Sequence, residues 1–259
     1  MKVVILAGGL GTRISEESHL KPKPMIEIGG QPILWHIMKM YGYYGFNDFI
    51  ICCGYKGYMI KEYFNDYFLH TSDVTFDFRE GNRIIVHKNT SEPWRVTLVD
   101  TGVNSQTGSR VAKVRKYIDG EPFMLTYGDG VSNVDLSHLL DYHKSSKSIA
   151  TITAIQPGGR FGILDLEKNN IVKKFSEKAI EDGGWINGGF MVFESGIFDY
   201  LSEQENCVLE TAPMAALARD KQLVAYKHEG FWQCMDTLRD REKLEGLWNS
   251  AQAPWKLWD

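Results

Sequence analysis

The chain opens with residues 3–13, VVILAGGLGTR, in which an apolar run passes directly into a glycine-rich segment. Consecutive Val, Ile and Leu residues are typical of a strand that is buried on both faces of a parallel sheet. Glycines let the backbone turn tightly, and successive N–H groups in such a turn form a concave site for an anion. Arg13 and Lys23 add positive charge for phosphate oxygens. The opening therefore predicts a strand that ends in a phosphate-binding loop.

Two common nucleotide-binding motifs do not fit this loop. The dinucleotide fingerprint G-x-G-x-x-G needs a third glycine where the chain has Ile14. A Walker-type loop needs G-K-[S/T] after its glycines, and no such triplet follows Gly11. The loop is therefore expected to bind phosphates in another way.

The rest of the first half alternates between strand and helix patterns. Short apolar runs at 49–53 and 123–127 alternate with helical periodicity over 32–44 and 58–67. This alternation predicts an α/β fold with a doubly wound, mostly parallel, Rossmann-like sheet. Ligands of such sheets bind at the carboxyl ends of the strands, which is where the glycine loop must lie.

Two further regions depart from the alternation. Residues from about 71 to 101 read as an antiparallel β insertion, with a hairpin turn at 80–82. The part from about 150 to 259 looks β-rich, and its run 186–193 reads as one strand. We expect a single domain over 1–259, with one functional half at about 1–149 and the other at about 150–259.

Composition limits the class of protein. The 259 residues are 43% hydrophobic and 24% charged, which is ordinary for a folded globular chain. A net charge of -4 argues against a nucleic-acid-binding surface. The first apolar run is too short for a signal peptide, and no run suggests a membrane helix. The four cysteines have no metal-site spacing. We expect a cytoplasmic protein that binds neither membrane nor nucleic acid.

The motifs taken together resemble those of the sugar-1-phosphate nucleotidyltransferases. After the opening loop, PKPM at 22–25, GQPIL at 30–34, TYGDG at 126–130 and FWQCMDT at 231–237 follow the order found in that family. Segments 35–40, 52–57 and 98–102 resemble its cytidylyl-transferring members. The resemblance implies that CTP and glucose 1-phosphate give CDP-glucose and pyrophosphate, with Mg²⁺ as cofactor, upstream of a surface polysaccharide.

The resemblance also assigns roles to residues around the nucleotide. Arg13 and Lys23 would be catalytic, and Asp129 and Asp236 would hold Mg²⁺. Asp129 could instead stabilise its own turn, and Asp236 could cap the helix that follows it. The expected nucleotide-binding residues are Leu6, Ala7, Gly8, Gly9, Leu10, Gly11, Thr12, Arg13, Lys23, Ser105, Arg110, Gly128 and Asp129.

The sugar phosphate would be bound by the second half of the chain. Glu177 would accept a sugar hydroxyl and Lys178 would contact the phosphate, although Ala179 stands where the family usually has proline. The other expected sugar-phosphate residues are Gly162, Asn187 and Gly188.

The base is expected to be read by the backbone of residues 8–10 and by the loop at 100–110, which resembles the cytidylyl type. Ser105 and Arg110 are candidates for contacts with cytosine or phosphate, although a serine here could equally cap a turn. Three alternatives remain: the same reaction with UTP or dTTP, a non-catalytic nucleotide-binding regulatory homologue, and a structural assembly protein. We expect a homo-oligomer around an active enzyme.

Overall fold

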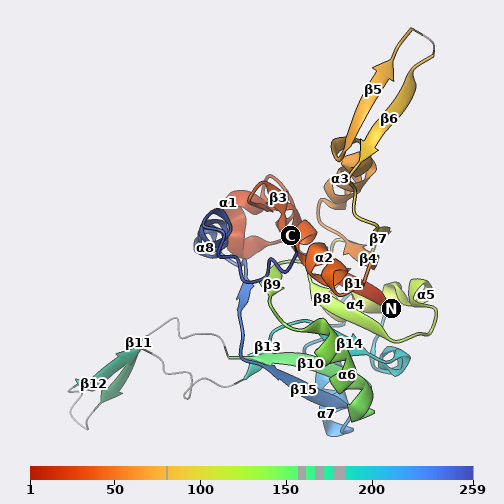
Figure 1. The fold of residues 1–259 in the computed structure, drawn as a ribbon. Coiled ribbons are helices and arrows are strands. Elements are labelled where there is room, and N and C mark those ends of the chain that lie inside the picture. Colours follow the sequence, from red (N-terminus) through yellow and green to blue (C-terminus); the bar gives the residue numbers. More distant parts are fainter. Residues whose placement is uncertain (80, 157–161, 167–171, 178–184, 259) are drawn as a thin grey trace.

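The computed structural model describes residues 1–79, 81–156, 162–166, 172–177 and 185–258, and its centre is a mixed sheet (Figure 1). The strand order is β13-β10-β14-β8-β1-β4-β7, and β15 pairs with β10. The pairs β1/β4, β1/β8, β4/β7 and β10/β15 are parallel, whereas β14 runs antiparallel to β8 and β10. The expected α/β fold with a mostly parallel sheet is confirmed. The strands are β1 (Lys2–Leu6), β4 (Asp48–Cys53), β7 (Arg95–Asp100), β8 (Phe123–Tyr127), β10 (Ala150–Ile155), β13 (Ile186–Asn187), β14 (Met191–Phe193) and β15 (Leu223–His228).

Helices cover both faces of this sheet. The helix predicted over 32–44 is observed with Pro32 at its N-cap, and the one predicted over 58–67 is longer. The α-helices are α1 (Ser15–Ser18), α2 (Ile33–Tyr43), α3 (Gly57–His70), α4 (Thr107–Lys113), α5 (Arg115–Ile118), α6 (Leu136–Ser146), α7 (Ala212–Arg219) and α8 (Leu238–Asn249). Within the described residues, 3-10 helices cover Thr12–Ile14, Lys23–Met25 and Ser195–Tyr200.

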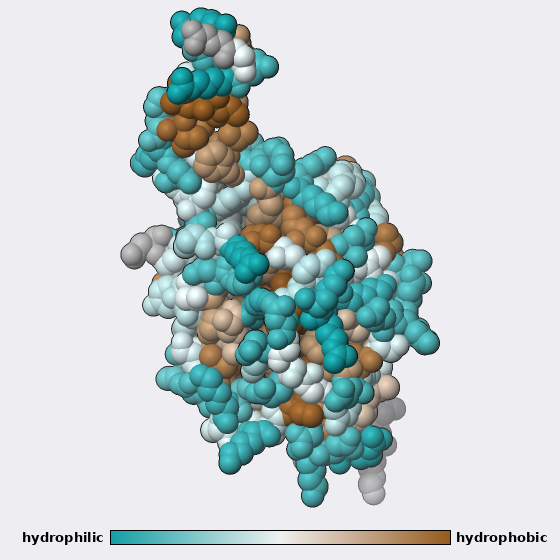
Figure 2. Space-filling model, turned by 90° about the vertical axis from the view of Figure 1, so that its right-hand side faces the viewer, coloured by the Kyte–Doolittle hydropathy of each residue, from teal (hydrophilic) through white to brown (hydrophobic). Residues whose placement is uncertain are grey.

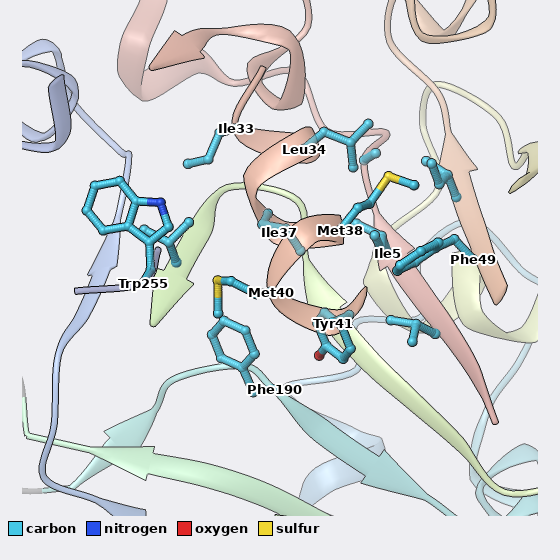
Figure 3. Close-up of a cluster of buried hydrophobic side chains, with 14 of the residues drawn as sticks. Ile5, Ile33, Leu34, Ile37, Met38, Met40, Tyr41, Phe49, Phe190 and Trp255 are labelled. Atoms are coloured by element: carbon cyan, nitrogen blue, oxygen red, sulfur yellow. The ribbon is translucent and has the colours of Figure 1, made fainter. Parts of the chain in front are cut away.

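Alternate side chains of β1 enter two separate cores, as the pleat of a strand requires. Val3 and Ile5 pack with α2, whereas Val4 and Leu6 pack with α4, α5 and α7. Burial on both faces explains why the opening run is continuously apolar. Figure 3 shows the first core, where α2 contributes Ile33, Leu34, Ile37, Met38, Met40 and Tyr41 beside Ile5, Phe49, Phe190 and Trp255.

The C-terminal tail packs on its own chain. Trp255 is fully buried in the first core, and its ring stacks on those of Trp248 and Phe231. The ring of His36 lies edge-on to Trp248. The tail therefore packs α8 and the segment of Phe231 against α2, which contains His36.

Short antiparallel pairs lie outside the main sheet. They are β2 (Glu27–Ile28) with β3 (Gln31–Pro32), β5 (Ser72–Asp77) with β6 (Arg83–Asn89), β9 (Gly130–Ser132) with β16 (Trp232–Cys234), and β11 (Gly162–Leu166) with β12 (Val172–Glu177). The β5–β6 hairpin projects from the body beyond α3 (Figure 1).

Two expectations about the strands are corrected. The insertion expected over about 71–101 is shorter, because β7 at its end pairs in parallel with β4 and belongs to the main sheet. The run 186–193 is two strands rather than one, because Gly189 and Phe190 between them have positive φ angles of 79° and 46°. Among the described residues, the helices are too short or too polar to cross a membrane.

Candidate active site

A cavity of about 400 Å³ opens at the carboxyl ends of β1 and β8. This is the edge where a parallel sheet of this kind binds its ligands. Leu10 lies outside the cavity wall and is half exposed. The other expected nucleotide-binding residues line it: Leu6, Ala7, Gly8, Gly9, Gly11, Thr12, Arg13, Lys23, Ser105, Arg110, Gly128 and Asp129.

The glycines of the loop are required by close packing and by backbone conformation. A Cβ atom at Gly8 would lie 2.1 Å from the Arg110 guanidinium. Gly11 has a φ of +66°, a region that L side chains rarely adopt. Glycine is therefore required at position 8 by the close approach of Arg110 and at position 11 by the backbone conformation.

Opposite charges meet at the floor of the cavity. The Lys23 ammonium donates to Asp129 at 2.6 Å and to Asp236 at 2.7 Å. Arg13 donates to the other oxygen of Asp236 at 2.5 Å. The Lys23 side chain is only 10% exposed, whereas that of Arg13, although paired with Asp236, is 73% exposed. Two cations from one segment of the chain and two carboxylates, 106 and 213 positions after Lys23, thus form one cluster.

The β9–β16 pair brings the two aspartates together. Gly130 pairs with Cys234, and the Met235 amide donates to the Asp129 carbonyl at 2.8 Å. Asp129 and Asp236 therefore leave this small ribbon side by side. Neither aspartate motif could have shown this pairing alone, because it depends on the contact between two distant strands.

The charged neighbours of Lys23 and Asp236 shift the pKa values of these two residues. Burial would raise the pKa of Asp236, but the hydrogen bond and charge of Lys23, with the charge of Arg13, outweigh it and lower that pKa. Burial would lower the pKa of Lys23, but the two aspartates outweigh it and raise that pKa. The charged forms of Lys23 and Asp236 are therefore favoured near neutral pH.

The alternative role of Asp236 as a helix cap does not fit the geometry. Helix α8 is capped by Thr237, whose side chain accepts from the Asp240 amide while the Asp240 carboxylate accepts from the Thr237 amide. This reciprocal capping box leaves the Asp236 carboxylate to face Lys23 and Arg13. The Asp129 carboxylate likewise points to Lys23 rather than into its own turn.

The two carboxylates suit a hard divalent cation. Both aim an oxygen at the Lys23 ammonium, so the protein already gathers them around one positive charge. Mg²⁺ prefers one or two carboxylates with phosphate oxygens and water completing its shell. Within the described part of the chain, no group of three or more His, Cys, Asp or Glu residues could hold a metal ion. The donor set therefore fits Mg²⁺ bound together with a phosphate ligand.

The Arg110 and Ser105 side chains are both engaged in hydrogen bonds within the protein, which the sequence did not indicate. The buried Arg110 guanidinium donates to the carbonyls of Gly8, Cys53, Gly102 and Val103 and to the Thr101 hydroxyl. The Ser105 hydroxyl donates to the Thr101 carbonyl at 2.5 Å and accepts from Lys113. Arg110 thus holds the 100–110 loop against the glycine loop, whereas Ser105 bonds to Thr101 of its own loop and to Lys113 of α4. The alternative of a turn-stabilising serine therefore fits the observed bonds.

A second cavity of about 240 Å³ adjoins the first and shares Arg13, Tyr127 and Asp129 with it. Asn187 and Gly188, both expected to bind the sugar phosphate, line this cavity. Two further expected residues, Gly162 and Glu177, face each other across the β11–β12 pair. Lys178 and Ala179 lie outside the described residues.

Several cavity residues escaped the sequence analysis. Trp232 donates from its indole to the Gly188 carbonyl at 2.7 Å and fixes the loop between β13 and β14. Tyr127 lies between the cavities, donates to Glu210 at 2.6 Å and accepts from Asn187 at 3.2 Å. Tyr127 lies in the motif TYGDG at 126–130, and Trp232 lies in the motif FWQCMDT at 231–237. Their closeness in sequence to the two aspartates could have marked them as cavity residues. Glu210 precedes a helix and carried no such signal.

Comparison with known proteins gives a consistent result. A family model described as nucleotidyl transferase matches residues 2–241. The chain is 56% identical to glucose-1-phosphate cytidylyltransferase of Salmonella typhi, over the whole of both chains. It is 45% identical, again over both whole chains, to a Bacillus subtilis protein described as a probable glucose-1-phosphate cytidylyltransferase. The solved structure of apo UDP-glucose pyrophosphorylase matches 97% of this chain and 98% of its own, with a TM-score of 0.70 and 17% identity, and so shares the fold.

Proposed function

Because the chain belongs to the nucleotidyl transferase family, we propose that it transfers the cytidylyl group of CTP to α-D-glucose 1-phosphate, giving CDP-glucose and pyrophosphate. The observation that carries this proposal is the 56% identity over the full length of the Salmonella typhi enzyme. The cluster of Arg13, Lys23, Asp129 and Asp236 supplies the charges that such a reaction needs.

The reaction needs little from the protein in the way of proton transfer. A phosphate monoester has a second pKa of about 6, so the sugar phosphate is largely ionised near neutral pH. One of its oxygens attacks the α-phosphorus of CTP, a new P–O bond forms, and the bond to the β-phosphate oxygen breaks. The electron pair leaves with pyrophosphate. Catalysis is then a matter of alignment and charge stabilisation.

The cationic side chains supply that stabilisation. Lys23 lies in the cavity wall beside both aspartates, and we assign it to the α-phosphate, where charge develops. Arg13 is exposed at the cavity edge and suits the β- and γ-phosphates, which leave together. The glycine loop offers backbone N–H groups to the same oxygens.

Members of this family work with a divalent metal ion, and we propose Mg²⁺ held by Asp129 and Asp236. When bound, the ion would neutralise phosphate charge and fix the orientation of phosphate oxygens. The two aspartates would then exchange the Lys23 ammonium for the ion, and Lys23 would turn to the phosphate.

The sugar phosphate is assigned to the second cavity, which shares Arg13 and Asp129 with the first. The Asn187 amide oxygen accepts from the Gly189 N–H at 3.0 Å, which fixes the orientation of its side chain. Asn187 and Gly188 would bind sugar hydroxyls there, together with Gly162, Glu177 and Lys178.

Two alternative functions would require different features of the site. A transferase that prefers UTP or dTTP would need another base-reading loop, and the resemblance of the 100–110 loop to the cytidylyl type favours CTP. A silent regulatory homologue would tolerate loss of the charged cluster, but its four members are present and in contact.

We further propose that the protein is a homo-oligomer assembled in part through the β5–β6 hairpin. Its cross-strand pairs Phe76/Ile84 and Val74/Val86 place these side chains on one face, and Phe78 beyond them is 75% exposed. Figure 2 shows this apolar patch on the projecting hairpin, above a largely polar surface. A lone hairpin is marginally stable in water, so the exposed face suits a covering partner. A second copy of the chain is the commonest kind of partner.

Sedimentation analysis tests the oligomer. The wild-type chain should sediment as an oligomer, and a Phe76→Ser/Ile84→Ser variant should dissociate to smaller species. A wild-type protein that sediments as a monomer would remove this part of the proposal.

Pyrophosphate release tests the activity. The protein is incubated with Mg²⁺ and glucose 1-phosphate and with CTP, UTP, dTTP, ATP or GTP in turn, and Asp129→Asn serves as the inactive control. We expect the highest kcat/KM with CTP and a loss of at least about 100-fold in the variant, as for an electrostatic group acting in the transition state. Preference for another nucleotide would overturn the base assignment. Release with none of them would overturn the function.

A further inference from the structure

A carboxylate outside the charged cluster is fixed in the wall of the first cavity. Glu210 lies between the Ser195–Tyr200 helix and α7 and is one of the cavity-lining residues. Its two oxygens accept separate hydrogen bonds, from the Tyr127 phenol at 2.6 Å and from the Thr107 hydroxyl at 2.6 Å. A long, exposed Glu side chain would otherwise sample many rotamers, so two donors on one carboxylate give it a defined direction.

The Tyr127 phenol and the Thr107 hydroxyl each donate one of these hydrogen bonds, so each oxygen of the Glu210 carboxylate has one protein donor. An ionised carboxylate has about four acceptor positions on its two oxygens, so each oxygen of Glu210 can still accept a hydrogen bond from a ligand.

The position of Glu210 along the cavity indicates which part of a nucleotide it meets. Thr107 follows Ser105 in the loop to which the base is assigned, whereas Tyr127 is two residues before Asp129, where the phosphates are assigned. Glu210 bonds to both and so lies between these two subsites. In a nucleoside triphosphate the ribose joins the base to the phosphates. We propose that Glu210 accepts hydrogen bonds from the ribose 2′ and 3′ hydroxyls and makes the site selective for ribonucleotides.

This inference rests on the proposed nucleotidyl transfer and adds the recognition of the sugar of the nucleotide. A 2′,3′-diol offers two donors side by side, which matches a carboxylate with one free acceptor position on each oxygen. A 2′-deoxynucleotide leaves one of these positions without a ligand partner. The adjoining sugar-phosphate cavity meets Tyr127 on its other side, where the phenol accepts from Asn187.

The test compares ribo- and deoxynucleotides in wild-type and Glu210→Gln protein. The kcat/KM values for CTP and dCTP are measured with glucose 1-phosphate, and the Kd values of both nucleotides are measured by calorimetry. Glu203→Gln, on the same connection but outside this cavity wall, is the matched control. Gln preserves the size of the side chain and an acceptor for the Tyr127 phenol, so the variant should fold.

We expect the wild-type protein and the Glu203→Gln control to prefer CTP over dCTP by roughly 10- to 100-fold, as one or two hydrogen bonds to a charged acceptor would give. In Glu210→Gln this preference should fall about tenfold, because a neutral amide binds hydroxyls more weakly. Equal losses for CTP and dCTP, or an unchanged preference, would overturn the inference. A change in the CTP-to-UTP ratio with the ribose preference intact would assign Glu210 to the base instead.

Failure of the function is distinguishable from failure of the inference. If the protein turns over UTP and not CTP, the kcat/KM values of UTP and dUTP are compared instead, and the inference is tested in the same way. Binding of no nucleotide at all would overturn both.

Discussion

Replacing Lys23 by Met removes the central cation of the charged cluster while keeping the length of the side chain. In the structure its ammonium lies 2.6 Å from Asp129 and 2.7 Å from Asp236, and its side chain is 10% exposed. Without it the two carboxylates face each other, with Arg13 as the remaining nearby cation of the cluster. The variant should therefore be less stable than the wild-type protein.

The magnitude follows from the two bonds lost. A hydrogen bond between charged groups contributes roughly 1.5 to 3 kcal/mol, and Arg13 and water recover part of it, so we expect a loss of about 2 to 4 kcal/mol. For a chain of this size each kcal/mol shifts Tm by about 2 to 4 °C. In EDTA the Lys23→Met variant should melt roughly 5 to 10 °C below the wild-type protein.

Mg²⁺ should restore much of this loss, because a divalent ion can replace the missing ammonium between the aspartates. The wild-type protein without nucleotide should respond little, because Lys23 and the ion compete for the same oxygens. Calorimetric melting with and without millimolar Mg²⁺ measures both effects. The control is Lys21→Met, which breaks a surface pair with Glu27 and should cost less than about 1 kcal/mol. Equal Mg²⁺ responses in wild-type and Lys23→Met protein, or an undiminished Tm in EDTA, would refute the reasoning.

Three other changes probe the fold and the site. Burial raises the pKa of Asp236, but Lys23 and Arg13 lower it by more. The pKa of Asp236 is therefore lower in the folded protein than in the unfolded chain. Its stabilisation is therefore present above the unfolded value of about 3.9 and is lost as pH falls through the folded value. Asp236→Asn should accordingly unfold with a shallower pH dependence below about pH 4, and an identical acid profile would count against the ion pairs. Trp255→Ala should lose about 3 to 5 kcal/mol in urea denaturation, whereas a loss under about 1 kcal/mol would mean that the tail does not fasten the core. Arg110→Met leaves several buried carbonyls without their donor and should raise the KM for CTP at least about tenfold, as loss of one such bond would. An unchanged KM would separate the loop from nucleotide binding.

The local features of the fold could be read from the sequence. The strand at 3–6 and the helix α2 were predictable because an apolar run buried on both faces and a 3.6-residue period are properties of short segments. The cavity wall followed largely from the glycine loop, because a loop after a parallel strand must lie at the ligand-binding edge.

The remaining features depend on contacts between distant segments. The run 186–193 contains Asn187-Gly188-Gly189, a turn signal that the prediction of one strand did not use, and Gly189 and Phe190 break the run with positive φ angles. The capping box shows that Thr237 and Asp240, and not Asp236, cap α8. Only the positions of the side chains distinguish these candidates. Glu210 reaches the cavity through bonds to Thr107 and Tyr127, about 100 and 80 positions earlier in the chain, which no local pattern encodes.

The central claim is that an oxygen of the sugar phosphate attacks the α-phosphorus of CTP. It is tested most directly with glucose 1-phosphate that carries oxygen-18 in its non-bridging phosphate oxygens, mixed with unlabelled CTP and Mg²⁺, and with both products examined by mass spectrometry. We predict that CDP-glucose retains all of the label and that the pyrophosphate contains none. A CDP-glucose that has lost one labelled oxygen would mean that the phosphorus of glucose 1-phosphate is attacked and the α-phosphorus of CTP is not, and would contradict the account.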